Sequence, residues 1–522
     1  MRGDDRNSPS AARHGSYRSG FAFGILSFLA MAAFGVVSTI VTARMYGVGI
    51  IGQFALVSAP VAALWVLSTA KEQAALIKEI TGLPPRHPRV TQLFAAVFTF
   101  SSGLTAVMSV LGALVVWLLF RGPLHVPQLV TPAFVSLAGY AIVTNTAWNF
   151  DSIFSAFVAG RQLFWVRLHE TLSFLAIAIA IGLAWHSVWG LVIATIGGSL
   201  TALVHRLVIV RPFVRARLTF PEYRVGLQAL PGLLRFGLKI TPGSIALGIS
   251  GQAGVWVIRA VGGSVALVGA YSRAQTIPER LQQVNIRIVE VLYPTLVGRR
   301  GRGDHEGFDR ALTDTIRYAL VGMLLIAAVF GGAAHAILQL FGPGFSRATF
   351  VLMLLMAYPA LNSITVAQNQ ALFAVDLPGL TSFVSITRMA LTITVTVLLT
   401  PAIGITGPAV ALLGGSALDV IWKSLVLHPY LSVPLREIWP RTQRLALVGG
   451  YVGGFAAAYA VTEAIPSVGG LLVGLVAGTL TYLVLLIACG GINHRDRARL
   501  TEFTATIRAR RGGGGSSPEP VG

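Results

Sequence analysis

The feature that most constrains this chain is a series of about fourteen apolar stretches between residues 21 and 489, most of them near or above the ~20 residues that an α-helix needs to cross a bilayer. Short polar breaks separate them. Charged residues make up 11% of the chain, against about 25% in an ordinary soluble domain. A water-soluble enzyme is therefore excluded. The sequence predicts an all-α polytopic membrane protein with about fourteen transmembrane helices.

The formal net charge of +20 follows from the placement of the basic residues. With the N-terminus in the cytoplasm and the spans alternating, 32 of the 40 Lys and Arg residues fall in cytoplasmic segments and four on the opposite side. Cytoplasmic loops collect Lys and Arg, so we expect both termini in the cytoplasm and no nucleic-acid partner. The first span, residues 21–43, ends in a stretch resembling a signal-peptide cleavage site, but its apolar run is longer than a signal core.

The chain resembles itself at an offset of about 216 residues. The motif from Gly190 to Ser199 recurs from Gly407 to Ser416, and Arg206 matches Lys423. The offset covers six spans, and an even number preserves orientation, so we expect two parallel repeats related by an axis along the membrane normal. Two such lobes are typical of alternating-access transporters. Further matches are Arg44-x2-Gly47 with Arg259-x2-Gly262, and Gly52-Gln53-Phe54 with Gly269-Ala270-Tyr271.

The repeat and the composition divide the chain into five parts. We predict a disordered basic tail (1–19), an N-lobe of helices 1–6 with a cytoplasmic amphipathic linker (20–236), a C-lobe of helices 7–12 (237–430), helices 13 and 14 (431–490), and a cytoplasmic tail with a disordered end (491–522).

Four motifs carry a resemblance to a known group over about residues 20 to 430. The first runs from Arg44 to Phe54 and has the pattern R-x-x-G-x-x-x-x-G-x-F. The others are Tyr293-Pro294, the turn from Leu340 to Phe345 followed by Ala348, and the turn from Gly404 to Ala409. In this order and spacing the motifs resemble the multidrug/oligosaccharidyl-lipid/polysaccharide (MOP) exporters, and within them the Wzx-type flippases of lipid-linked oligosaccharides.

The resemblance implies a flippase of the bacterial plasma membrane that moves a polyprenyl-pyrophosphate-linked glycan between leaflets. Its partners would be this substrate, membrane lipids and a glycan polymerase or ligase. Fourteen spans also match the related lipid II flippases, which keeps lipid II open as a substrate. A cation-coupled drug exporter of the same superfamily remains an alternative, although residues 21–43 contain none of the carboxylates typical of such proteins. A non-transporting scaffold is a third.

Arginines inside the eighth expected span, residues 265–297, are the strongest site candidates. Arg273, Arg280 and Arg287 are spaced by seven residues, which places them on nearly one face of a helix. Charges in a span are costly and usually functional, and guanidinium groups suit phosphate oxygens. We expect them to bind pyrophosphate in a cavity between the lobes. The alternative is a helix that projects into the cytoplasm, with these arginines solvated or paired.

Each of the other candidate site residues has two interpretations. Arg388 in the eleventh span is either a cavity residue or part of an intramembrane ion pair. Arg44 and Arg259 are interfacial anchors or phosphate contacts on the exit side. The side chains Asn145, Asn149, Asn362 and Asn369 contact sugar hydroxyls or form hydrogen bonds between helices. Asp419 and Lys423 are expected to pair locally.

Signals for other chemistry are weak. The single cysteine, Cys489, excludes an internal disulfide, and the histidines lack metal-ligand spacing. We expect no cofactor, no metal site and no enzyme activity.

Overall fold

The computed structural model describes residues 17–69, 72–157, 159–215, 217–282, 284–431 and 441–491. Side chains in these ranges are described except at 17–33, 74, 236–237, 239–240 and 284–291. The described residues form helices without a β-strand, which confirms the all-α class. The expected disordered tails, 1–19 and 491–522, fall almost wholly outside these ranges.

Eleven described helices are long and apolar enough to cross a membrane. The chain is therefore a multi-pass membrane protein, while the count of fourteen spans remains a prediction. One of the eleven merges two helices, because α1 is interrupted at Gly47. The regions of the seventh and eighth expected spans, α8 and α9–α10, are helical but are not among the eleven.

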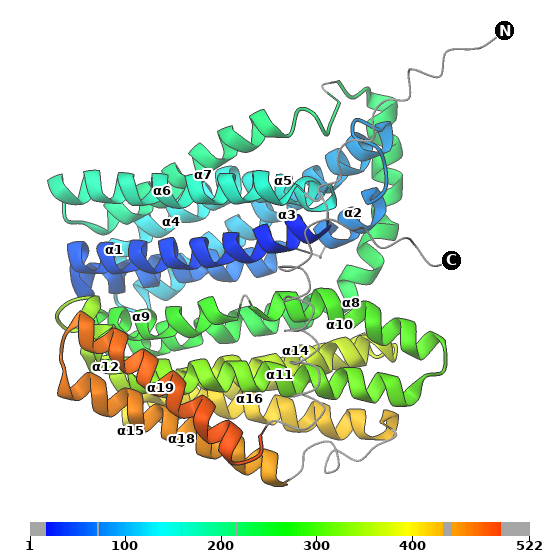
Figure 1. Cartoon of the computed structure of the whole chain (residues 1–522). Coiled ribbons are helices and arrows are strands. Elements are labelled where there is room, and N and C mark those ends of the chain that lie inside the picture. Colours follow the sequence, from blue (N-terminus) through cyan, green and yellow to red (C-terminus); the bar gives the residue numbers. More distant parts are fainter. Residues whose placement is uncertain are drawn as a thin grey trace, which may run out of the picture.

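The N-terminal half holds α1 to α7, coloured blue to cyan in Figure 1. The π-helical turn Tyr140–Thr144 joins α4 to α5, so these two form a single passage. The bounds are α1 Tyr17–Leu67, α2 Glu72–Ile80, α3 Pro88–Arg121, α4 Val130–Gly139, α5 Asn145–Ala156, α6 Gly160–Ala184 and α7 Val188–Ile209.

The C-terminal half lies beside the first and runs from green to orange in Figure 1. Its bounds are α8 Phe220–Ala260, α9 Val265–Leu281, α10 Val284–Gly301, α11 His305–Gly332, α12 Ala334–Leu340, α13 Thr349–Leu355, α14 Tyr358–Ala374, α15 Pro378–Ile403 and α16 Thr406–Leu427.

Helix α8 connects the two halves. It packs on α3 of the N-terminal half and on α15 of the C-terminal half, and Figure 1 shows it passing from one half to the other. The amphipathic linker expected before residue 237 is thus the first part of α8, which continues into the seventh expected span without a break in the helix. Two prolines, Pro231 and Pro242, lie inside it.

The final helices, α18 (Arg441–Ala464) and α19 (Val468–Ala488), form an antiparallel pair that packs on α11. The hydroxyl of Tyr482 donates to the carbonyl of Val321 in α11 at 2.9 Å. Most large apolar side chains on their other faces are exposed, as is usual for helices that face lipid. This pair is an addition to the C-terminal half.

The repeated Arg-x2-Gly motif marks two equivalent hairpin turns. Gly47 interrupts α1 with φ +72°, and Gly262 lies between α8 and α9 with φ +89°. Residues with side chains rarely adopt this conformation, which explains a glycine at both places. The turns lie at the end of the bundle that carries few basic residues, here called the outer end.

Candidate functional site

Two arginines join the halves at the outer end. The Nε of Arg44 in α1 donates to the carbonyl of Leu340 at the end of α12, at 2.7 Å. The Nη2 of Arg259 in α8 donates to the carbonyl of His125, in the loop after α3, at 3.1 Å. The donors are 215 residues apart, and so are the acceptors. We call these two reciprocal bonds the outer latch.

A pair of glycines brings the same two halves into backbone contact. A Cβ on Gly52 in α1 would collide with the carbonyl of Val265 in α9, and a Cβ on Gly269 would collide with the carbonyl of Val48. These contacts are also reciprocal, with an offset of 217 residues for both members. The glycines of the repeated Gly-x-aromatic motif therefore allow α1 and α9 to touch. With the outer latch, they hold the outer end of the two halves together.

The outer latch settles where Arg44 and Arg259 lie but leaves their expected phosphate contact untested. Arg44 is exposed and lines a hollow of about 430 Å³ with Gln339, Gly342, Pro343 and Ser346. Only its Nε is used in the latch among the bonds of the described residues. Arg259 is half-buried and also donates to Gly263.

The arginines of α9 lie deeper between the halves. Arg280 is exposed, and its Cζ is 3.9 Å from the position that a Cβ on Gly35 of α1 would occupy. Its guanidinium therefore reaches the opposite half. Arg273 is half-buried, its Nε is buried without a hydrogen-bond acceptor among the described residues, and the charge of Arg280 acts on it. Among the described residues, neither of these two arginines forms an ion pair, and each acts on the other through its charge.

The expected stripe of three arginines stays a prediction, because the structure places its members on two helices and describes the side chains of only two of them. Helix α9 ends at Leu281 and α10 begins at Val284, so Arg287 belongs to α10 while Arg273 and Arg280 belong to α9. Pro278 has no backbone N–H to give to the preceding turn, which weakens the helix shortly before the break. The side chain of Arg287 lies outside the described residues.

Glu279, a residue absent from the sequence-based candidates, lies next to Arg280. It is exposed, and Gln275 donates to its Oε1 at 2.7 Å while also donating to the carbonyl of Gly251 at 2.7 Å. The Gln275 bridge fixes the carboxylate against α8. In the sequence, Glu279 could have been identified as a candidate because it is adjacent to Arg280.

Arg388 lies in an ion cluster, in agreement with the second interpretation, an intramembrane ion pair. It is buried, and its Nη1 is 3.2 Å from Oδ2 of Asp419, whose Oδ1 is 2.7 Å from Nζ of Lys423. Its Nη2 donates to Ser416 at 2.9 Å. The expected local pair of Asp419 and Lys423 is confirmed. Both Nη atoms are thus engaged within the C-terminal half in this conformation, while Nε is buried without an acceptor among the described residues.

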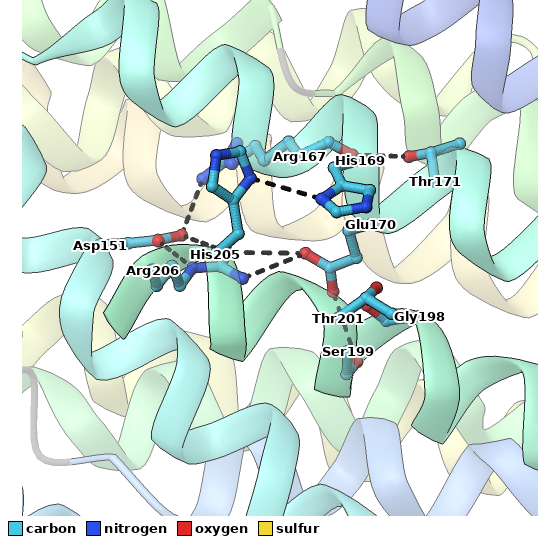
Figure 2. Close-up of polar contacts among 10 residues, drawn as sticks. All are labelled: Asp151, Arg167, His169, Glu170, Thr171, Gly198, Ser199, Thr201, His205 and Arg206. Carbon is cyan, nitrogen blue, oxygen red and sulfur yellow. Dashed lines mark hydrogen bonds and ion pairs between the residues drawn. The ribbon is translucent and has the colours of Figure 1, made fainter. Parts of the chain in front are cut away.

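The N-terminal half has a charge cluster at the equivalent place, shown in Figure 2. Arg206 is fully buried in α7, with Nε 2.8 Å from Asp151 in α5 and Nη1 3.4 Å from Glu170 in α6. Ser199 donates to Glu170 at 3.3 Å. Arg206 matches Lys423 and Ser199 matches Ser416 at an offset of 217. Each repeat thus neutralises charges inside its own helices.

The four asparagines divide between the halves. Asn145 and Asn149 are buried and form hydrogen bonds with Ser101 of α3, and Gln73 of α2 donates to Asn149 at 3.3 Å. Their bonds join helices, which is the second reading given above. The other two lie on α14: Asn362 is half-buried and donates to Gln282 at 3.2 Å, and the Oδ1 of Asn369 is buried without a donor among the described residues.

Within the described residues, no group of three or more His, Cys, Asp or Glu side chains is arranged to hold a metal ion.

Comparisons with known proteins agree on one kind of molecule. Residues 18–298, just over half of the chain, match the family model described as polysaccharide biosynthesis protein. A probable low-salt glycan biosynthesis flippase of Haloferax volcanii, Agl15, is 23% identical over 226 residues. That match covers 42% of this chain and 46% of the relative, so it spans about half of that protein.

Two solved structures share the fold. The lipid II flippase MurJ in an inward closed conformation superposes with a TM-score of 0.66 at 11% identity, covering 89% of this chain and 98% of that one. An inward-facing multidrug transporter of the MATE family in the MOP superfamily superposes with a TM-score of 0.60 at 14% identity, covering 77% and 95%. By name, these proteins are flippases and transporters and not enzymes.

Proposed function

Because the chain belongs to the polysaccharide biosynthesis protein family, we propose that it is a flippase of lipid-linked oligosaccharides. Its substrate is a glycan on polyprenyl pyrophosphate, which it carries from the inner to the outer leaflet of a bacterial plasma membrane. Both termini lie in the cytoplasm. The product serves a glycan polymerase or ligase in the synthesis of a cell-surface polysaccharide.

The observation that carries the proposal is the pair of arginines on α9 that form no ion pair among the described residues. Arg280 reaches across to Gly35 of the other half, and Arg273 has a buried Nε without an acceptor. Pyrophosphate is a multivalent anion, and guanidinium groups bind phosphate oxygens with paired, charge-assisted hydrogen bonds. A drug cation would be repelled at the same place. The charge therefore favours an anionic headgroup between the halves.

The outer latch would allow the site to be open to one side of the membrane at a time. With Arg44 and Arg259 bonded across the halves, the outer end is closed, and substrate enters from the inner side. Breaking the latch lets the halves separate at the outer end around the bound headgroup. Two hydrogen bonds and a glycine contact are a modest barrier, which suits a gate that opens in each cycle.

The test is mass spectrometry of polyprenyl-pyrophosphate glycans from a depletion strain, complemented with wild type or with Arg280→Ala. Loss of a charge-assisted contact costs about 1.5–3 kcal/mol, or roughly 10- to 100-fold in binding. We expect wild type to clear the accumulated lipid-linked glycan and Arg280→Ala to leave it. The mass of that species identifies the sugar and separates a surface glycan from lipid II.

Arg224→Ala is the matched control. Arg224 is an exposed arginine near the start of α8, away from the space between the halves, so its loss removes the same charge from another place. We expect full complementation. An unchanged lipid-linked pool in the depleted strain, together with altered sensitivity to cationic drugs, would contradict the proposal.

Glu279 is the one observation that favours the alternative, a cation-coupled drug exporter. An exposed carboxylate beside Arg280 could attract a cation, as such exporters require. Its immediate neighbour Arg280 opposes this, because the positive charge acts on the same carboxylate. Glu279→Gln separates the two: it should abolish drug resistance in an exporter and leave pyrophosphate binding in a flippase.

A further inference from the structure

A second polar hollow lies on the N-terminal half, away from α9. It has a volume of about 450 Å³ and is formed where α6 begins and α7 ends. Its lining residues are Arg161, Gln162 and Trp165 of α6 with His205 and Ile209 of α7. No carboxylate lines it. The nearby Asp151 and Glu170 are both engaged by Arg206.

The hollow presents hydrogen-bond donors that the described part of the chain leaves free. Arg161 is exposed, and among the described residues neither Arg161 nor Gln162 has a hydrogen-bond or ion-pair partner. The ring of His205 meets that of His169, with Nδ1 atoms 3.4 Å apart, and Figure 2 shows the two rings turned toward each other. When the Nδ1 of His169 donates, the proton of His205 is on its Nε2, which is then free to donate into the hollow. Free donors around a concave surface without a carboxylate favour an anion.

The position of the hollow indicates which anion. Arg161 is the second residue of α6 and Ile209 the last of α7, so the hollow lies at the helix ends where lipid headgroups are found. Trp165 is half exposed there, as tryptophans are at membrane interfaces. Farther along the same helices, toward the bilayer centre, exposed apolar side chains continue the surface: Leu172, Leu200 and Val204. A headgroup site thus adjoins a surface for acyl chains.

We propose that this hollow binds the phosphate of an anionic glycerophospholipid of the inner leaflet, with the acyl chains lying against α6 and α7. Arg161 contacts the phosphate, Gln162 and His205 complete the donors, and Trp165 sets the depth. The site is separate from the arginines of α9, so its failure would leave the proposed function untouched. It holds a lipid that is bound and not transported.

The test uses the full chain in nanodiscs of equal parts phosphatidylglycerol and phosphatidylcholine, with retained lipid counted by native mass spectrometry. Wild type should retain phosphatidylglycerol in preference to phosphatidylcholine. A single basic residue near an anionic membrane contributes about a five-fold change in affinity, so Arg161→Gln should reduce retention by about that factor. Arg161→Lys, which keeps the charge, should retain most of it.

Arg224→Gln removes the same charge from an exposed position on α8 and should leave retention unchanged. Equal retention of both lipids by wild type, or equal retention by Arg161→Gln and Arg224→Gln, overturns the proposal. In the last part of the experiment, inorganic phosphate is added as a competitor. If it displaces phosphatidylglycerol from wild type completely, the site recognises a free anion and the lipid assignment is wrong.

Discussion

Arg44 and Arg259 occupy equivalent places in the two repeats, and each donates to a backbone carbonyl of the opposite half. The acceptors, Leu340 and His125, are equivalent to one another as well. Such crossed bonds follow from a two-fold relation between the repeats, because any contact from one half to the other must then occur twice. The outer latch is therefore a product of the duplication.

The first prediction concerns the outer latch. Replacing both arginines, in Arg44→Gln/Arg259→Gln, should shift the protein toward a form that is open at the outer end. Each charge-assisted bond is worth about 1.5–3 kcal/mol, so the double variant should change the population at least about ten-fold. Spin labels at Trp185 and Ile403, exposed outer positions on opposite halves, would report the distance in a Cys489→Ser background.

Arg121→Gln is the control for the latch. Arg121 lies at the outer end of α3 and stacks on Trp117 of its own helix, so it makes no contact between halves in this pair. The distribution of distances between the spin labels in Arg121→Gln should match that of wild type. If the double latch variant also matches wild type, the latch does not hold the outer end closed.

The second prediction concerns the glycine contact between α1 and α9. Gly52→Ala should prevent close approach of the halves, because the added Cβ would meet the carbonyl of Val265. Backbone cannot move aside as a flexible side chain can. We expect loss of glycan flipping with the protein still inserted, and an outer-end distance longer than in wild type.

Gly49→Ala is its matched control. Gly49 lies on the same helix, and a Cβ built there meets nothing within 4 Å. This variant should flip glycan normally. Equal activity of Gly52→Ala and Gly49→Ala would show that the contact with Val265 is not needed.

The third prediction concerns the buried cluster of the N-terminal half. Arg206→Met should destabilise the protein by about 3–5 kcal/mol, because it leaves the carboxylates of Asp151 and Glu170 without their buried cation. The loss would appear as a lower midpoint of unfolding in detergent. Arg167→Gln removes an exposed arginine 3.6 Å from the same Asp151 and should cost only about 0–1 kcal/mol. Similar midpoints for the two variants would contradict this ranking.

The fourth prediction concerns pH at the start of α8, outside the membrane. The backbone N–H and the hydroxyl of Thr219 donate to Glu222 at 2.9 and 2.8 Å, which lowers the pKa of the Glu222 carboxyl. A lowered pKa means that the cap is fully present above the pKa of the unfolded chain and is lost as the pH falls through the folded one. Hydrogen exchange of the Thr219 amide should therefore accelerate as the pH falls through the pKa of Glu222 in the folded state.

Glu222→Gln provides the comparison for this cap. The amide cannot ionise, so exchange at Thr219 should lose its dependence on the Glu222 titration once the intrinsic pH dependence of exchange is removed. An identical profile in the wild type and in Glu222→Gln would show that the carboxylate does not hold the first turn.

Hydropathy predicted the helices, because it depends on local composition, and the repeated motif predicted the equivalence of Arg206 with Lys423. The sequence could not show that the eighth expected span, residues 265–297, would form two helices. Leu281 and Val284 end and begin separate helices, which moves Arg287 off the helix of Arg273 and Arg280. Whether a proline bends, breaks or is tolerated depends on what packs around it.

The sequence by itself determined that this chain crosses a membrane many times and that its two halves repeat, and it predicted that most basic residues lie on one side. Those properties follow from hydropathy, period and count. Only the tertiary structure decided which charges are free. Arg388 and Arg206 are neutralised by carboxylates on neighbouring helices, Arg44 and Arg259 are engaged across the halves, and Arg273 and Arg280 have no anionic partner of their own among the described residues. The partner of a buried charge is chosen by helix packing over long sequence separations, which no local pattern encodes.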